Sequence, residues 1–556
     1  MSYVDKARPL RWLVAAPFSA VPAGRVQLAS GERFGNLMAK VSPQATVEIP
    51  DGLGRDATRT VTLGFERPRD FRLVEVIKRV DALSRLTKTA KQLASDADFD
   101  AALRQLRATV GDGELVQAVE QVASGQPAAA PSPPSSTSTS TPAAAPAPKD
   151  PESSSGSAID AIFSKAEVPS GPTPGDVTTA AKSGLDAFIG AMRQARSSTT
   201  KAPVKSASQA ARAREAAQLI RRAAEATAID LLATPAIATL ESAWRGFRMV
   251  ISSSPGAEEL LVDMMDTDTS RLLADLEAHL AAEPLDRPDV VFVAVPIAST
   301  ELLQALAALG ERSSVPIVAE VPYDTSGAEL DDRTDQPPMP DAWAELRSLT
   351  STQWLCAASN AIVLANEEAD GTHRIVFGSP VWGLASMLSA SVGQTGGPGQ
   401  VFGRAGALVA PASYLPSGKQ DGHGIATERT VSVDRQRALA DRGVLALGSE
   451  RGTDRLRLAA APMVHTGGDD DLQLPGRLLA GRTSRLVQAV RNELPPQATN
   501  QEVAARLADA STNFLPRGPR GAVALEVRTD ADGNLQVAAS IGAGLAGAAF
   551  KFSSDL

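Results

Sequence analysis

The side chains best suited to catalysis or metal binding are few and scattered in this sequence. The chain of 556 residues has one cysteine, Cys356, and four histidines, His279, His373, His423 and His465. A single cysteine excludes an intrachain disulfide framework and any zinc site built from several cysteines, and the histidines show no ligand spacing. Cys356 lies in the apolar stretch TQWLCAASNAIVLAN, which favours a buried structural thiol over a nucleophile. These positions predict no catalytic residue.

Three short motifs suggest a cofactor or a metal by their letters alone. GAGLAG, at 542–547, matches a dinucleotide-binding pattern, but the chain ends nine residues later, which leaves no room for the helix and the distant acidic residue. The acidic stretches GGDDD, at 467–471, and DDRTD, at 331–335, lack the spacing and final glutamate of a calcium loop. A phosphate-binding loop and a Gly-x-Ser-x-Gly elbow are also missing from the sequence. We therefore predict neither cofactor nor metal, and expect that the protein is not an enzyme.

Composition limits the function classes further. A net charge of −9 and a pI near 5.3 argue against a nucleic-acid partner, which needs a basic face. No apolar run approaches the roughly 20 residues of a membrane span, so no membrane insertion is expected. The opening KARPLRWLVAAPFSAVPA has the outline of a secretory signal, but Pro17 and Pro22 interrupt it, and RWLVAAPF also fits a first buried strand. We favour the strand and a cytoplasmic protein.

Residues 126–157, QPAAAPSPPSSTSTSTPAAAPAPKDPESSSGS, divide the chain. This stretch is rich in Pro, Ala, Ser and Thr, has no hydrophobic period and cannot build a core, so we interpret it as a linker. Upstream, 1–125 is predicted to be a small α/β domain. RWLVAAP and TRTVTLGF have strand composition, RFGNLMAKVS is helical, and helical spacing begins at Leu73.

Just past the linker, 158–184 holds a short helix, SAIDAIFSKAEV, followed by a flexible segment. Ser157 is a good N-cap, and Ile159, Ile162 and Phe163 share one face. A short helix between flexible flanks does not stabilise itself. It requires a groove, either on its own domain or on a partner, and the residues alone leave both readings open.

The region 185–556 is predicted to be mainly α/β. Residues 185–252 are strongly helical, with Thr234 as a cap, Pro235 in the first turn and a core stripe after it. The stripe consists of Ile237, Leu240, Trp244, Phe247 and Ile251. Strands and helices alternate over 253–400, as in an open sheet with parallel neighbours, and 401–556 ends in helices and a β-hairpin. The predicted fold class is thus mixed α/β, with an open-sheet domain as the larger part.

The string Leu240-Glu241-x-x-Trp244-Arg245-Gly246-Phe247 resembles the Leu-Glu-x-x-Trp-Arg-Gly-Leu signature of the large subunit of the type VI secretion contractile sheath. AWAELRSLTSTQWLCAASNAIVLAN, GSPVWGLASMLSASVGQTG and ATERTVSVDRQRALADRGVLAL resemble later blocks of that subunit in the same order. RFGNLMAKVSPQATVEIP and FERPRDFRLVEVIKRVDALSRLTKTAKQL are similar to segments of the small sheath subunit. Two features depart from its pattern. Leu73 stands where the family has proline, and only MSYVDKARPL precedes the first strand, where the family has a longer extended strand.

This resemblance implies a natural fusion of the small and large sheath subunits. Such a protein would polymerise with itself around an inner tube, contract on a signal from a baseplate and drive effector export. The helix with Ile159, Ile162 and Phe163 resembles the motif that an AAA+ ATPase grips to recycle contracted sheaths. The alternatives are a tail sheath of another contractile injection particle and, less favoured, an α/β enzyme with an unrecognised site.

Overall fold

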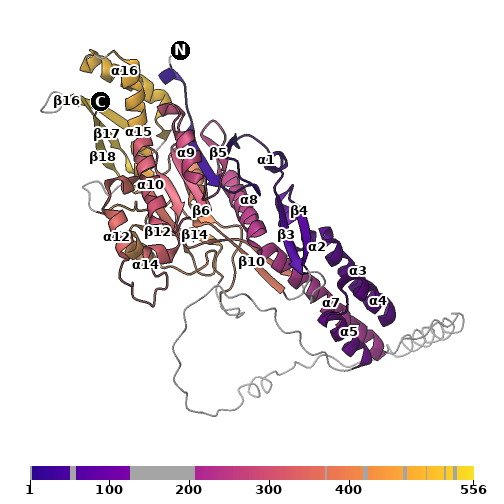
Figure 1. Ribbon diagram of the computed structural model, residues 1–556. Coiled ribbons are helices and arrows are strands. Elements are labelled where there is room, and N and C mark those ends of the chain that lie inside the picture. The colour runs from indigo at the N-terminus through magenta and orange to yellow at the C-terminus, as the bar shows by residue number, and fades with distance from the viewer. Residues whose placement is uncertain are drawn as a thin grey trace, which may run out of the picture.

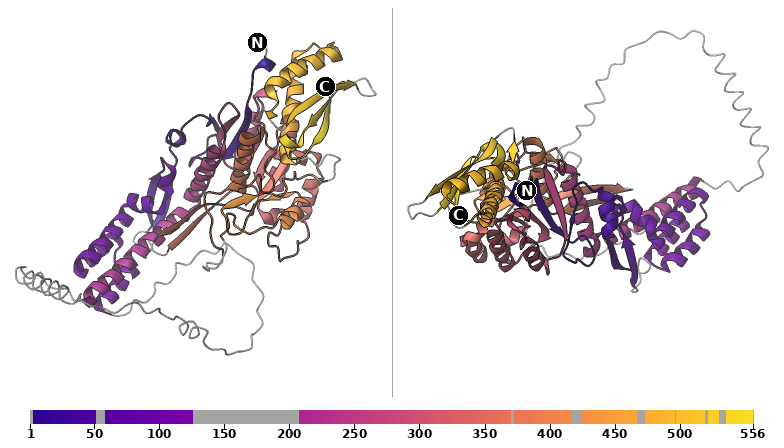
Figure 2. Two further views of the ribbon diagram at one scale, coloured as in Figure 1. Left: turned by 180° about the vertical axis from the view of Figure 1, so that it is seen from behind. Right: turned by 90° about the horizontal axis from the view of Figure 1, so that it is seen from above.

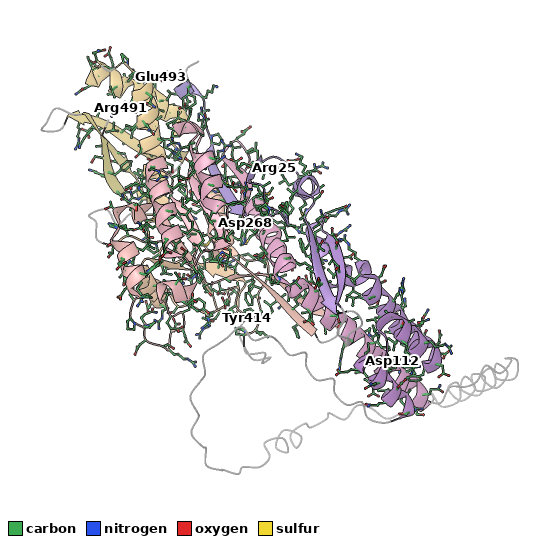
Figure 3. The ribbon with its side chains drawn as sticks, in the orientation of Figure 1. Arg25, Asp112, Asp268, Tyr414, Arg491 and Glu493 are labelled. Carbon is green, nitrogen blue, oxygen red and sulfur yellow. The ribbon has the colours of Figure 1, made fainter. Side chains whose placement is uncertain are left out.

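The computed structural model describes residues 3–50, 58–125, 207–369, 372–416, 424–466, 473–495, 497–518, 521–529 and 535–555. Figure 1 shows an elongated molecule, with a bundle of N-terminal helices at one end and the C-terminal helices and strands at the other. Among the side chains labelled in Figure 3, Asp112 lies in the helical bundle and Glu493 at the opposite end. Within the described part, no single helix is long and apolar enough to span a membrane, although two consecutive helices with a 76° bend between them have the length and composition together.

A seven-stranded sheet forms the centre of the molecule. Its order is β12 (Val444–Ala446), β8 (Leu355–Ser359), β7 (Ile317–Glu320), β6 (Val290–Pro296), β1 (Leu10–Ala16), β5 (Leu260–Asp266) and β2 (Arg25–Leu28). Every neighbouring pair is parallel except β2 with β5. The nearly continuous apolar runs of these strands, such as VVFVAVP in β6, suit a sheet that is covered on both faces. The predicted mixed α/β fold is confirmed.

The sheet crosses the division at the linker. The predicted small domain at 1–125 supplies β1, which lies between β5 and β6 of the large region, and also β2 at the edge. All seven residues of β1 pair with β5, from Leu10 with Leu260 to Ala16 with Asp266. The first segment therefore completes the large sheet, which a domain division at residue 125 did not anticipate.

Two sets of helices cover the two faces of the sheet, as alternation along β1 requires. Leu13 and Ala15 face a core with α9 (Leu272–Leu280), α10 (Thr300–Ser313), α12 (Asp341–Ser348) and α14 (Val433–Ala440). Trp12 and Val14 face the other core, with α8 (Pro235–Ser253) and α13 (Pro380–Thr395). The five tryptophans are buried, as their apolar contexts predict.

The rest of the N-terminal segment packs along one long helix. It contains α1 (Phe34–Val41), the antiparallel strands β3 (Gln44–Pro50) and β4 (Thr58–Gly64), and then α2 (Leu73–Arg79), α3 (Asp81–Asp96), α4 (Phe99–Val110) and α5 (Glu114–Ser124). α2, α3 and α5 contact α7 (Ala207–Ala233), which continues into α8. The views from behind and from above in Figure 2 agree that these helices project from the sheet as a bundle.

The region after β8 contains two strand systems outside the main sheet. NAIVLAN forms most of β9 (Ile362–Ala369), but this strand pairs antiparallel with β10 (Thr372–Gly378), and the parallel strand is LCAAS in β8. The alternation over 253–400 suggests that every strand there, NAIVLAN included, joins the parallel sheet, and for NAIVLAN this is wrong. A small sheet joins β11 (Leu408–Val409), β14 (Arg455–Arg457) and β13 (Gly448–Ser449).

The C-terminal part holds α15 (Leu474–Glu493), α16 (Asn500–Phe514) and a four-stranded antiparallel sheet. The sheet order is β15 (Arg517–Gly518), β16 (Gly521–Thr529), β17 (Leu535–Ile541) and β18 (Phe550–Asp555), with the short α17 (Ala543–Ala546) before β18. The predicted hairpin is present as β16 and β17, and the GAGLAG motif is the turn at α17.

Candidate functional site

The residues singled out by the large-subunit signature lie on α8, where the N-terminal segment meets the rest of the chain. α8 begins at Pro235 after Thr234, but the Thr234 hydroxyl donates back to the carbonyl of Leu231 and does not cap the helix. Leu240, Glu241, Trp244, Gly246 and Phe247 are all buried. We call this contact region the joint; it consists of α8, the β9–β10 hairpin, α13, and Phe18, Phe34 and Leu73 of the N-terminal segment.

Aromatic side chains form the apolar half of the joint. The indole N–H of Trp244 donates to the carbonyl of Phe18 at 3.0 Å, and the two rings meet edge to face with centroids 5.2 Å apart. Phe247 packs on Phe18 in the same manner at 5.2 Å, and Phe34 packs on Trp244 at 5.8 Å. Aromatic pairs in this geometry stabilise beyond their buried area. Two signature residues thus bind two phenylalanines of the N-terminal segment.

Gly246 permits close approach of α13. A Cβ atom at this position would lie 2.4 Å from ring atoms of Trp382, a distance that real Cβ contacts do not reach. Trp382 is fully buried and lies 6.5 Å from Phe18, centroid to centroid. The glycine of the signature is therefore required by packing between α8 and α13.

The polar half of the joint is a cluster of two glutamates and two arginines. Glu241 has no exposed surface and pairs with Arg245, one turn on, at 2.7 Å and with the buried Arg374 of β10. Arg245 and Arg374 also pair with Glu367 of β9, at 2.7 and 3.6 Å. The four formal charges cancel, which is the condition for keeping ions in a buried site. The signature pointed to Glu241 and Arg245 but not to Arg374 and Glu367, because the hairpin holds other charged residues, such as Glu368, from which the sequence does not distinguish them.

The cluster extends to the N-terminal segment through Glu367. Its Oε2 accepts a hydrogen bond from the backbone N–H of Leu73, the first residue of α2, at 3.1 Å. Asp70, three residues before Leu73, is also buried. Its carboxylate accepts hydrogen bonds from the backbone N–H groups of Glu66 and Arg67 and pairs with Arg79. Beside this contact is a cavity of about 400 Å³ that includes Arg72, Leu73, Arg245 and Glu367 in its lining.

A second contact ties the first eleven residues to the C-terminal helices. Asp289 is fully buried and pairs with both Arg482 and Arg485 of α15, while it also accepts the N–H of Arg11 at 2.8 Å. Arg482 in turn donates to the carbonyl of Arg8 at 2.6 Å. Burial lowers the pKa of Arg485 to about 10, yet the side chain stays charged at neutral pH.

The residues before β1 lie on the chain's own C-terminal helices. Tyr3–Asp5 form a short 3-10 helix that contacts α15 and α16. Asp5 pairs with Arg506 at 2.6 Å, and the Tyr3 hydroxyl donates to Asp286 at 3.1 Å. Residues 3–5 are thus helical and not part of an extended strand.

The described residues contain no strong candidate for catalysis. Cys356 is fully buried in β8, and burial raises the pKa of its thiol, so it is no nucleophile. No group of three or more His, Cys, Asp or Glu side chains in the described ranges is arranged to hold a metal. Glu320, at the end of β7, is partly buried, which raises the pKa of its carboxyl, and the carboxyl is hydrogen-bonded to Ser379. The predicted partner-binding residues Ile159, Ile162 and Phe163 lie outside the described residues, as does the linker at 126–157.

Comparison with known proteins bears on the N-terminal segment. Residues 25–121 match the family model described as type VI secretion system, VipA. This range includes α1, α2 and most of α5, and therefore much of the N-terminal side of the joint. No curated protein matches the chain.

Three solved structures show distant similarity. A chain of the anti-feeding prophage baseplate shares 13% identity over 56% of this chain and 76% of that chain, with a TM-score of 0.32. A chain of the sheath complex of an extracellular contractile injection system, in the contracted state, shares 12% identity over 56% of this chain and 76% of that chain, with a TM-score of 0.33. The sheath tail protein of Listeria innocua shares 12% identity over 53% of this chain and 61% of that chain, with a TM-score of 0.27. TM-scores this low do not establish a shared fold, so the family match is the finding that bears on identity. Residues 25–121 are thereby similar to the VipA family of the type VI secretion system.

Proposed function

We propose that this chain is a structural subunit of a contractile type VI secretion sheath, in which a small and a large sheath subunit are fused. The match of residues 25–121 to the small-subunit family supports it most. The joint supports the fusion, because Phe18 and Phe34 of the N-terminal segment pack on Trp244 and Phe247, residues that resemble the large subunit's signature. The subunit would act in the cytoplasm, where sheaths of this family assemble.

The function follows from packing and requires no reaction. Copies of the chain would polymerise around an inner tube into an extended, metastable lattice. A change at the baseplate would release the lattice into a contracted form with better contacts, and the free-energy difference would drive the tube outward. The extensive buried core and the lack of a convincing catalytic or metal site among the described residues fit a structural protein.

The linker would keep the two subunits together before assembly. A flexible chain of about 30 residues has a root-mean-square reach near 30 Å, which corresponds to a millimolar effective concentration of one half for the other. The structure adds a reason for close association, since β1 lies between β5 and β6 and must join the sheet as it folds.

Neighbouring subunits would share strands at the C-terminal sheet. The pair Gly518 and Gly521 closes the short β15–β16 ladder, and β15 covers only the first two residues of β16. Alternation along an antiparallel strand then directs the N–H groups of Val523, Leu525 and Val527 to the uncovered edge. Such an edge accepts an added strand, and we assign this role to the hairpin at 522–541.

A proline at the uncovered edge tests this assignment. Leu525→Pro removes one outward N–H group and leaves the pairing of β16 with β17 in place. Leu525→Ala is the matched control, because it removes the same side chain and keeps the N–H. We expect the proline variant to remain unpolymerised in sedimentation assays and the alanine variant to polymerise like the wild type. Equal polymerisation of both would exclude this edge.

The helix at 157–168 would recruit the AAA+ ATPase that recycles contracted sheaths, with Ile159, Ile162 and Phe163 filling its groove. Ile162→Asp places a charge on the apolar face and is expected to abolish capture of the purified ATPase in a pull-down, while assembly continues. Ile162→Leu, which preserves the apolar face, is the control. If wild type and the Ile162→Asp variant capture equal amounts of ATPase, the helix has another role.

The experiment that tests the whole proposal is negative-stain electron microscopy of the purified chain over a range of protein and salt concentrations. We expect hollow tubes with a cogwheel cross-section. Discrete small particles under every condition, together with turnover of a substrate, would instead favour an enzyme.

A further inference from the structure

At the start of α2 the backbone of the N-terminal segment binds a charged side chain from the C-terminal region. The N–H of Leu73 donates to Oε2 of Glu367 at 3.1 Å, across 294 positions in sequence. Leu73 is 3% exposed, so water does not compete freely for its N–H. A helix leaves its first N–H groups without partners inside the helix, and the carboxylate of Glu367 is the acceptor for one of them. The negative charge also lies favourably at the positive end of the helix.

Glu367 is held in place from its other side. Its Oε1 accepts a hydrogen bond from Arg245 at 2.7 Å, and Arg374 lies 3.6 Å from Oε2. Arg245 is in turn fixed by the buried Glu241. The carboxylate is therefore aimed at the start of α2 before that helix arrives, and preorganisation of this kind lowers the entropy lost when the contact forms.

The residue type at position 73 decides whether this hydrogen bond exists. Leu73 is the first residue of α2, and proline is a favoured residue at the first position of a helix. The backbone would accept it, because Arg72 has φ −71° and ψ 142°, the extended conformation that a residue before proline adopts. Proline nevertheless has no N–H to donate. Leucine in place of proline thus adds a donor and changes little else in the backbone.

We propose that Glu367 is the positioning residue by which the C-terminal region recognises its own N-terminal segment, through a hydrogen bond that a proline at position 73 cannot make. Pairing of the two segments therefore depends on a backbone donor at position 73, which leucine has and proline lacks. The inference concerns pairing within the chain and holds whether or not the protein forms a sheath.

The test is a double-mutant cycle on the full-length chain, read by hydrogen–deuterium exchange of the peptide that spans Val74–Val80. Leu73→Pro is compared with Leu73→Ala, since both lose the leucine side chain and only the alanine retains the N–H. The comparison is made with Glu367 present and again with Glu367→Ala. Glu367→Gln, which has a similar volume and one acceptor oxygen, serves in the same cycle if the alanine variant does not fold.

With Glu367 present, we expect the opening equilibrium of the Val74–Val80 peptide to be about ten times larger in the proline variant than in the alanine variant. The reason is that the proline variant loses a hydrogen bond to a charged group. In the Glu367→Ala background the ratio should fall to about one or below, since proline at the first helical position is intrinsically favourable. In the Glu367→Gln background it should be at most about threefold. A ratio near one with Glu367 present, or a tenfold ratio that persists after Glu367→Ala, would overturn the proposal.

Discussion

Gly246 offers a sharp test of how tightly the joint is packed. Gly246→Ala adds a single methyl group to α8, directed at Trp382 of α13, where it would lie 2.4 Å from three ring atoms. Neither residue can move toward solvent, because both are buried, and Trp382 is further confined by Phe18. The added methyl group must therefore displace the indole or separate the two helices.

The expected magnitude follows from two opposing effects. Overpacking a buried site typically costs about 1–3 kcal/mol, and the value here should be near 3 kcal/mol because the atom in the way belongs to a rigid ring. Alanine is better than glycine in a helix interior by about 1 kcal/mol. The net prediction is a loss of about 2 kcal/mol in the free energy of unfolding.

Gly35 is the matched control. It lies in α1, is exposed and has no atom within 4 Å of a built Cβ. Gly35→Ala should therefore stabilise the protein by about 0.5–1 kcal/mol. Guanidinium unfolding followed by tryptophan fluorescence measures both changes. If Gly246→Ala is as stable as Gly35→Ala, the close approach of α8 and α13 is not real, and the explanation of the signature glycine is refuted.

Three further predictions concern other parts of the molecule. Glu241→Gln removes the nearer of the two carboxylates that pair with the buried Arg374 and should lower the free energy of unfolding by about 3 kcal/mol; a denaturant midpoint equal to that of wild type would contradict this. Burial raises the folded-state pKa of Glu320, so the stability it contributes is complete below its unfolded pKa and is lost as pH rises through the folded pKa. Glu320→Gln should thus raise the melting temperature at pH 8 and leave it unchanged near pH 4, and the same change at both pH values would refute the assignment. A chain reduced to residues 207–556 lacks β1 and β2, so β5 loses both neighbouring strands and β6 loses one; it should be insoluble alone and recover on co-expression with 1–125, whereas a soluble, folded fragment would show that β1 is dispensable.

Local patterns in the sequence were sufficient to predict most elements of the fold. The spacing of Ile237, Leu240, Trp244 and Phe247 predicts the buried stripe of α8, and all four are buried. The apolar run RWLVAAP predicts a buried strand, which β1 is. These signals depend on residues close together in the chain, where periodicity reports burial directly.

Long-range pairing was not predictable in the same way. An apolar strand indicates that it is buried but not between which neighbours, so the place of β1 between β5 and β6 could not be read from 1–125 alone. The partners of Glu241 and Arg245 lie more than 100 positions away, at Arg374 and Glu367. Only folding of the β9–β10 hairpin against α8 brings these charges together, and no local pattern encodes that distance.

The central claim is that many copies of this chain assemble through fixed pairing of its two segments. Cryo-electron microscopy of the purified, full-length protein tests it most directly. The account predicts hollow helical tubes in which every subunit shows 25–121 docked on α8, with the Phe18–Trp244 and Leu73–Glu367 contacts in place. Particles that stay small and separate at every concentration, or tubes whose subunits lack density for 25–121 on α8, would contradict it.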